Sequence, residues 1–111
     1  PQLTFMTSYA TYYVTCASQA EAQQLAQGLI HHRLAACVNI IPSIQSYYEW
    51  DGKLQTAHES ALLIKSKHSL GSKITDFIKQ NHSYDCPCVV EWPLTSGHED
   101  FLRWIDRQTS H

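Results

Sequence analysis

The sequence lacks several features by which classes of protein are recognised. It contains no C-x-x-C motif although four cysteines are present, which removes the strongest signals for a zinc site or a thioredoxin-like redox centre. Its longest apolar runs, such as SALLI at 60–64, are far shorter than the roughly 18 to 20 residues of a membrane-spanning helix. Nothing near its start has the charged and apolar segments of a signal peptide. We therefore predict a cytoplasmic protein that does not span a membrane.

Charge of either sign is also sparse. The formal net charge is −2, and the eight Lys and Arg residues are scattered singly along the chain. Proteins that bind nucleic acid gather basic side chains against the phosphates, so we predict no nucleic-acid partner. The aromatic and glycine motif of RNA-recognition strands is absent as well, which argues against an RNA-binding protein.

What is present is typical of one folded domain. A chain of 111 residues with 43% hydrophobic residues has enough apolar surface for a core of its own. We predict a single domain over residues 1–111, within which residues 1–8 are expected to be disordered or foreign to the natural chain. A domain with its own core and no secretory signal is best assigned to a reducing compartment, so the four cysteines are expected to be free thiols.

The first third of the chain predicts a strand followed by a helix. Residues 9–15 are rich in β-branched and aromatic side chains and predict a strand that ends at Cys16. Ser18 and Glu21 then fit a capping box, in which each side chain bonds a backbone N–H at the start of a helix. Apolar residues recur afterwards at steps of three and four, which predicts a helix to about residue 32 or 33.

The middle of the chain predicts a long β-hairpin. Residues 34–41 form a continuous apolar run, as expected of a well-buried strand, and Cys37 within it is expected to lie in the core. The apolar character resumes in residues 44–50. The Asp-Gly pair at 51–52 is a common signal for a two-residue turn, because both positions favour a positive φ. Residues 58–67 are then the partner strand.

The last third predicts a helix, a strand and a helix. A second helix is expected from about residue 69 to 81, and the β-rich VVEWPL stretch predicts a strand that ends at Pro93. A last helix begins near Glu99. Its inward-facing residues are predicted to be Phe101, Leu102 and Ile105.

The predicted order β-α-β-β-α-β-α indicates an α+β fold. Two split β-α-β halves produce a ferredoxin-like sheet with a long central hairpin, and right-handed crossovers place both crossover helices on the same face. Such a monomer leaves a large aromatic surface without a partner, which predicts self-association. The aromatic residues concerned are Tyr12, Tyr47, Tyr48, Trp50 and Trp92.

Four stretches of the chain carry a resemblance to a known family. They read RLAACVNIIPSIQSYYEWDGKL, then ESALLIK, HSYDCP and FLRW, and together they resemble the CutA divalent-cation-tolerance family from about Tyr12 to Trp104. The resemblance implies a ferredoxin-like fold and a tight homotrimer made by the long hairpins, with an architecture like that of the PII signalling proteins. It also implies binding of copper or another divalent cation such as zinc. We therefore predict a metal-binding homotrimer that is not an enzyme and that has a signalling or adaptor role.

The resemblance also implies a metal site. Two of the family's metal-binding positions correspond to Cys16 and His82. The third corresponds to Cys88, where relatives usually carry glutamate instead of cysteine. A site of Cys16, His82 and Cys88 would favour softer ions, because thiolate and imidazole suit copper and zinc. Alternatively, the two cysteines are small hydrophobes at strand ends, and His82 interacts with the dipole at the end of its helix.

Three further positions resemble those around the family's cleft between subunits, namely Trp50, Lys65 and Tyr84. For Trp50 and Tyr84 the alternative is plain packing at an interface. Lys65 lies in an apolar strand, where it could be an edge charge or a contact for an anion.

Two other functions are alternatives to metal binding. Cys86 or Cys88 with His82 and Asp85 has the residue types of a cysteine nucleophile with its base, but the segment is too short to place all of them without strain. The role of Cys86 stays open. The main alternative to metal binding is a trimeric scaffold, or a binder of a small anion or effector, in which no metal acts.

Overall fold

The structure is a computed structural model that describes residues 8–111. The expectation for residues 1–8 lies outside the described residues except at Ser8, whose carbonyl accepts a hydrogen bond from the His68 N–H. The elements in chain order are β1 (Tyr9–Cys16), α1 (Gln19–His31), β2 (Cys37–Trp50), β3 (Lys53–Lys67), the 3₁₀ helix η1 (His68–Leu70), α2 (Gly71–Asn81), β4 (Val89–Pro93) and α3 (Glu99–Gln108).

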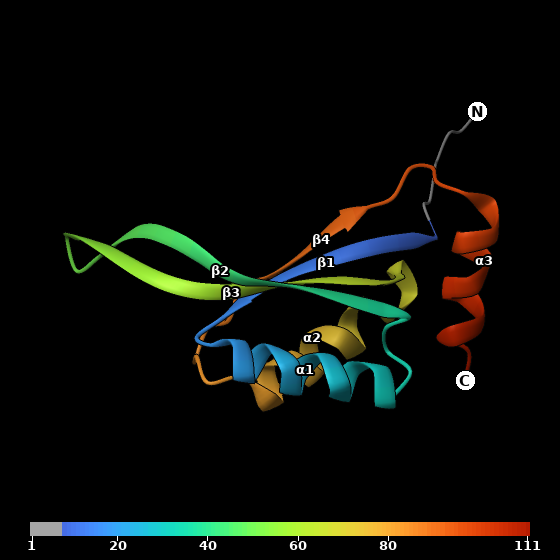
Figure 1. Cartoon of the computed structure of the whole chain (residues 1–111), viewed down its shortest axis with the longest axis horizontal. Helices are drawn as coiled ribbons and strands as arrows, with labels where there is room; N and C mark the ends of the chain where they lie inside the picture. Colours follow the sequence, from blue (N-terminus) through green and yellow to red (C-terminus); the bar gives the residue numbers. More distant parts are fainter. Residues whose placement is uncertain (1–7) are drawn as a thin grey trace.

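The four strands form one antiparallel sheet in the order β2-β3-β1-β4. This is the order that two split β-α-β halves produce, so the predicted ferredoxin-like α+β fold is confirmed. Figure 1 shows α1 and α2 together on one face of the sheet. The first and last strands are direct neighbours, which brings the end of β1 close to the start of β4.

The core lies between the sheet and these two helices. Tyr12 of β1 and Ile64 of β3 are paired across the sheet, and both belong to this buried cluster. Tyr12 is 2% exposed, which corrects the expectation that it forms part of the uncovered aromatic surface. Its side chain points toward the helices, and its hydroxyl donates to the Lys67 carbonyl at 2.7 Å, so the polar end is satisfied as well.

The hairpin extends well beyond the rest of the sheet (Figure 1). Its turn has φ values of 53° at Asp51 and 74° at Gly52, as predicted for the Asp-Gly pair. β3 begins at Lys53, five residues earlier than expected, and it pairs with β1 only from Ser60 onward. A bulge between Ile41 and Ile44 interrupts the β2–β3 ladder. Within the sheet, the outer part of the hairpin is therefore paired only between its own two strands.

The prediction that β2 is a well-buried strand was wrong. β2 begins at Cys37 and contains no buried residue, while Leu34 and Ala35 are buried in the segment before it. Cys37 is half-buried rather than a core residue. The reason is that β2 is the edge strand of this sheet, with a neighbour on one side only, and its register directs Cys37 to the face away from α1 and α2.

The face of the sheet opposite the two helices carries exposed apolar side chains. The rings of Tyr13 and Trp92 stack with their centroids 5.2 Å apart, and Trp92 is 48% exposed. Val90 and Ile41 are also exposed. With the exposed hairpin aromatics Tyr47, Tyr48 and Trp50, these side chains leave apolar surface on both the sheet and the hairpin without a partner.

The last helix, α3, lies at the end of the sheet far from the hairpin tip (Figure 1). Ile105 is fully buried and Leu102 half-buried, in agreement with the predicted inward face. Phe101 was wrongly predicted to face inward: it is 41% exposed and stacks on Trp104 instead. An ion pair between Lys67 of β3 and Asp106 connects α3 to the sheet.

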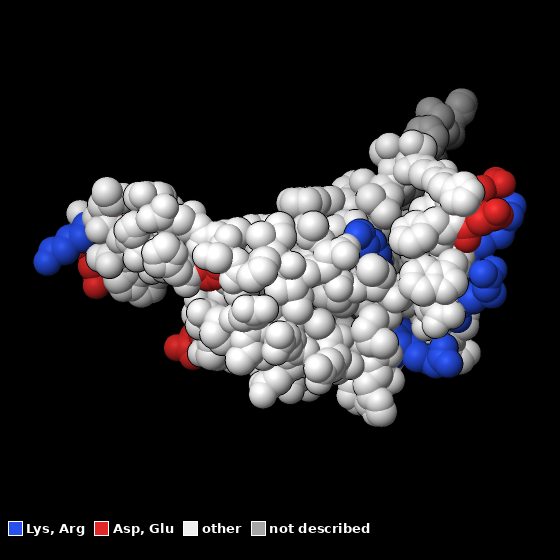
Figure 2. All heavy atoms as spheres, in the orientation of Figure 1, with Lys and Arg blue, Asp and Glu red and all other residues white. Residues whose placement is uncertain are grey.

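Charged side chains are few on the surface shown in Figure 2. They gather at the hairpin tip and around α3, with a mostly uncharged surface between them. None of the helices in residues 8–111 has the length and apolar character to cross a bilayer.

Candidate functional site

A cavity of about 690 Å³ lies where the hairpin leaves the sheet. It is bounded by the hairpin on one side and by the segment between α2 and β4 on the other. The lining residues are Thr15, Tyr48, Trp50, Gln55, Ala57, Glu59, Tyr84, Asp85, Cys86 and Cys88. Aromatic rings, two carboxylates and two thiols therefore share one cavity.

Glu59 of β3 organises the polar part of this cavity. The Tyr84 hydroxyl donates to its Oε2 at 2.8 Å, and the Ser46 hydroxyl donates to its Oε1 at 2.6 Å. Burial raises the pKa of Tyr84, and the carboxylate of Glu59 raises it further, so the phenol stays protonated and acts as a donor. Glu59 carries no signal of this role in the sequence, because one acidic residue in a strand is ordinarily a solvated side chain.

His82 closes α2 and is held on both of its ring nitrogens. Its side chain is fully buried. Nε2 lies 2.8 Å from the carbonyl oxygen of Thr15, and Nδ1 lies 3.0 Å from the backbone nitrogen of Tyr84. A carbonyl only accepts and a backbone N–H only donates, so Nε2 carries the proton and Nδ1 is the acceptor. A metal ion, or a catalytic proton transfer, would have to displace one of these two bonds.

Glu21 fastens the segment after α2 to the start of α1. The backbone N–H and the hydroxyl of Ser83 both donate to its carboxylate, at 2.7 and 3.0 Å, and the Ala17 N–H donates at 3.2 Å. The Ser18 hydroxyl accepts from the Glu21 N–H as predicted, but the carboxylate reaches Ala17 rather than the Ser18 N–H of a standard capping box. Burial alone would raise the pKa of Glu21, yet these hydrogen bonds lower it.

The lowered pKa of Glu21 predicts a pH dependence of stability. Its contribution is fully present above the unfolded-state pKa of about 4.3 and is lost as the pH falls through the lower folded-state value. We expect Glu21→Gln to lower the free energy of unfolding at pH 7 and the difference from the unchanged protein to shrink toward pH 3. Urea unfolding at several pH values measures this. Glu49→Gln, at an exposed position, is the control, and a difference that does not depend on pH would contradict the prediction.

The structure does not bring the three predicted metal ligands together. Cys16 is buried in the core, where its thiol donates to the Ser18 carbonyl at 3.5 Å, and burial raises its pKa. Val14 pairs with Val89, so the next residues along, Thr15 and Cys88, lie on one face and Cys16 on the other. Accordingly Thr15 and Cys88 line the cavity and Cys16 does not. Within residues 8–111, no three His, Cys, Asp or Glu side chains form a group that could hold a metal ion.

The three predicted cleft residues also separate. Trp50 and Tyr84 line the same cavity, whereas Lys65 is not among its lining residues. Lys65 lies opposite Cys37 in the β2–β3 ladder, and its ammonium group donates to the Asn39 side-chain carbonyl. Only two of the three residues are therefore parts of one site in the single chain.

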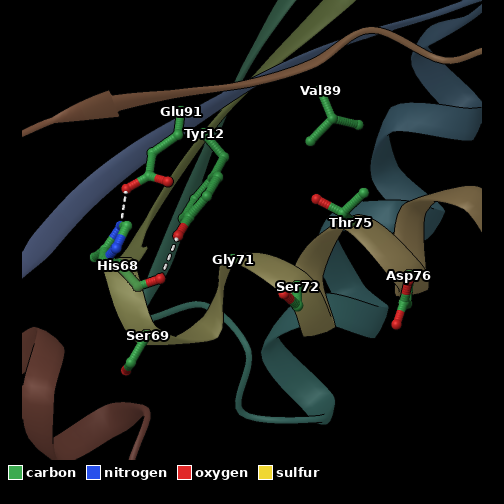
Figure 3. A pocket seen from close by; sticks show the side chains of 9 residues that line it. All are labelled: Tyr12, His68, Ser69, Gly71, Ser72, Thr75, Asp76, Val89 and Glu91. Carbon is green, nitrogen blue, oxygen red and sulfur yellow. Dashed lines mark hydrogen bonds and ion pairs between the residues drawn. The ribbon is translucent and has the colours of Figure 1, made fainter.

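A second cavity of about 650 Å³ lies beside the start of α2 (Figure 3). It is lined by Tyr12, His68, Ser69, Gly71, Ser72, Thr75, Asp76, Val89 and Glu91. Figure 3 shows the His68 ring pointing at Glu91, with Nδ1 2.6 Å from Oε2. A Cβ at Gly71 would lie 3.2 Å from the Tyr12 hydroxyl oxygen, so a residue with a side chain would crowd this wall. This cavity has hydroxyl and carboxylate groups but no thiol.

The fold defines a class of protein, namely ferredoxin-like α+β sandwiches with a projecting hairpin. The model of the CutA1 divalent ion tolerance protein family matches residues 10–108, and the chain belongs to this family. A chloroplastic CutA protein of Arabidopsis thaliana is 41% identical over 97 residues, covering 87% of this chain and 53% of its own length. A divalent-cation tolerance protein CutA of Archaeoglobus fulgidus is 40% identical over 94 residues, covering 85% of this chain and 91% of its own.

Solved structures have the same fold. The crystal structure of CutA1 from Oryza sativa superposes with a TM-score of 0.92 at 39% identity, covering 94% of this chain and 95% of that one. The chain spans little more than half the length of several curated relatives, such as those of Arabidopsis thaliana, rice and human. The plant relatives are named chloroplastic, so the predicted cytoplasmic location stays a prediction.

Proposed function

We propose that the protein is a homotrimer that binds copper or another divalent cation, such as zinc, and acts in metal tolerance or metal response. A signalling or adaptor role of the trimer is part of this proposal. Membership of the divalent ion tolerance family supports the binding of a metal ion. The observation that supports the proposal is the cavity beside the hairpin, whose lining includes the thiols of Cys86 and Cys88 and the carboxylates of Asp85 and Glu59. Thiols suit soft ions and carboxylates suit harder ones.

Of the metal ligands implied by the resemblance, Cys88 fits this cavity best. It is exposed and lines the cavity, whereas Cys16 and His82 are buried and bonded to carbonyl groups of the protein. A site made of all three would need Cys16 and His82 to leave those partners. We therefore place the ion at the Cys88 side of the sheet, and treat Cys16 and His82 as ligands only after such a rearrangement.

The divalent-ion site is tested by adding Zn²⁺ to the reduced protein, because zinc has no redox chemistry with thiols. We expect a saturable isotherm and a melting temperature that rises with Zn²⁺, by an amount corresponding to about 2.7 kcal/mol at 100 times the Kd. A chelator should reverse the rise. Cys88→Ser should weaken binding, whereas the buried Cys16→Ser should leave it nearly unchanged.

A second function is favoured by one observation. Both nitrogens of His82 and the thiol of Cys16 are already bonded within the protein, as in a site that needs no metal. The protein would then be a trimeric scaffold, or would bind a small anion or effector. Failure of Zn²⁺ and of copper to bind the reduced protein would favour this alternative.

A further inference from the structure

Two of the four cysteines differ from the others in their surroundings. Cys86 and Cys88 are both exposed free thiols, and both line the cavity beside the hairpin. Cys16 is buried and donates its proton to a carbonyl, and Cys37 is half-buried in β2. Cys86 and Cys88 are therefore the accessible thiols of the described chain, and they are separated by a single proline.

The Cys-Pro-Cys segment suits a pair of ligands. A residue before proline favours an extended backbone, and proline holds its own φ near −65°. Side chains two positions apart on an extended backbone point to the same side, with Cα atoms about 6.6 Å apart. An ion bound between two sulfurs needs them no more than about 4.6 Å apart, if each metal–sulfur bond is about 2.3 Å long. Two cysteine side chains can close that distance by rotation about their Cα–Cβ bonds.

The surroundings supply no third strong ligand. Both carboxylate oxygens of Glu59 accept hydrogen bonds, from Tyr84 and from Ser46. No group of three His, Cys, Asp or Glu side chains is close enough for a metal ion within residues 8–111. Zinc in structural sites takes four ligands, whereas soft thiolates select Cu(I), which is satisfied by low coordination numbers. Tyr48 and Trp50 add aromatic surface to the lining of the same cavity.

We propose that Cys86 and Cys88 bind one Cu(I) ion per chain as a pair of thiolates. This inference rests on the proposed function, because it assigns that function's metal to particular ligands and to an oxidation state. Binding replaces the two S–H bonds with two Cu–S bonds and releases two protons, and copper stays at +1 throughout. The nearby Asp85 carboxylate attracts the cation as it approaches the cavity.

The test is a Cu(I) titration of the reduced full chain without oxygen, in competition with a coloured Cu(I) chelator. We expect one ion per chain. Cys86→Ser and Cys88→Ser should each weaken binding by about 100-fold or more, because each removes one of two thiolates. Cys37→Ser is the matched control and should bind as the unchanged protein does. Circular dichroism of each variant checks that the fold is intact, as expected at the exposed Cys86 and Cys88 and the half-buried Cys37.

Three results would overturn the proposal: retention of Cu(I) binding by Cys86→Ser or Cys88→Ser, its loss in Cys37→Ser, or one ion shared by two or more chains. The Zn²⁺ titration separates this proposal from the proposed function. If Zn²⁺ binds and Cu(I) does not, the thiolate pair is wrong and divalent-ion binding stands. If Cu(I) binds through Cys86 and Cys88 and Zn²⁺ does not bind, the pair stands and divalent-ion binding fails.

Discussion

We expect the protein to sediment as a particle of three chains of 12.7 kDa each, and Trp50→Ala to shift this particle toward single chains. Trp50 is 67% exposed in the isolated chain, and Tyr47 and Leu54 near it are 64% and 75% exposed. These side chains lie on the part of the hairpin that does not pair with β1, and a second chain packed against the hairpin would cover them. Truncating an aromatic residue in a packed environment commonly costs about 3 to 5 kcal/mol.

Sedimentation equilibrium at micromolar concentration measures the assembly directly. Lys53→Ala is the matched control, because Lys53 pairs with Trp50 in the hairpin and is itself exposed. It should leave the mass unchanged. The prediction fails if the unchanged protein sediments as a single chain, or if Trp50→Ala keeps both its mass and its melting temperature.

The second large effect is expected at His82. The pairing of β1 with β4 ends at Val14, so β4 does not bond the carbonyl of the next residue, Thr15. The His82 ring donates to this carbonyl in place of a strand. His82→Ala removes this bond and the bond from the Tyr84 N–H, and leaves a cavity at a fully buried position. We expect a loss of about 2 to 5 kcal/mol in the free energy of unfolding, from the cavity and from polar groups left without partners.

The free energy of unfolding of His82→Ala is measured with a chelator present, so that no metal contributes to stability. His98→Ala is the control, since the His98 side chain is 77% exposed and its removal should change stability by less than about 0.5 kcal/mol. An undiminished stability of His82→Ala without metal, combined with lost metal binding, would show instead that His82 is a metal ligand.

Much of the fold could be predicted because its signals are local. The Asp-Gly turn has the positive φ values that its residue types favour, and Ser18 caps α1 as the sequence indicates. The periods of apolar residues placed both ends of α1 and α2 within about two residues of their observed bounds, and the start of α3 was predicted at Glu99, where it lies. Each of these features depends on residues within a few positions of one another, whose preferences the sequence states directly.

The candidate site was predicted less well. The sequence singled out Trp50, Tyr84 and Cys88, which do line one cavity, but it also grouped Cys16 and His82 with Cys88. Whether side chains from different elements converge depends on strand register, since a shift of one position moves a side chain to the other face of the sheet. The contribution of Glu59 had no local signal either, because its partners Tyr84 and Ser46 come from distant parts of the chain.

By itself, then, the sequence determined the order of the elements, the hairpin turn and the family to which the chain belongs, because these follow from short-range preferences and from residue patterns along the chain. The tertiary structure alone decided that Tyr12 is buried, that Cys37 lies on an edge strand, and that Cys16 and Cys88 occupy opposite faces of one sheet. The physical reason is that burial and convergence are set by which strands become neighbours and in which register, and those contacts join residues far apart in the chain.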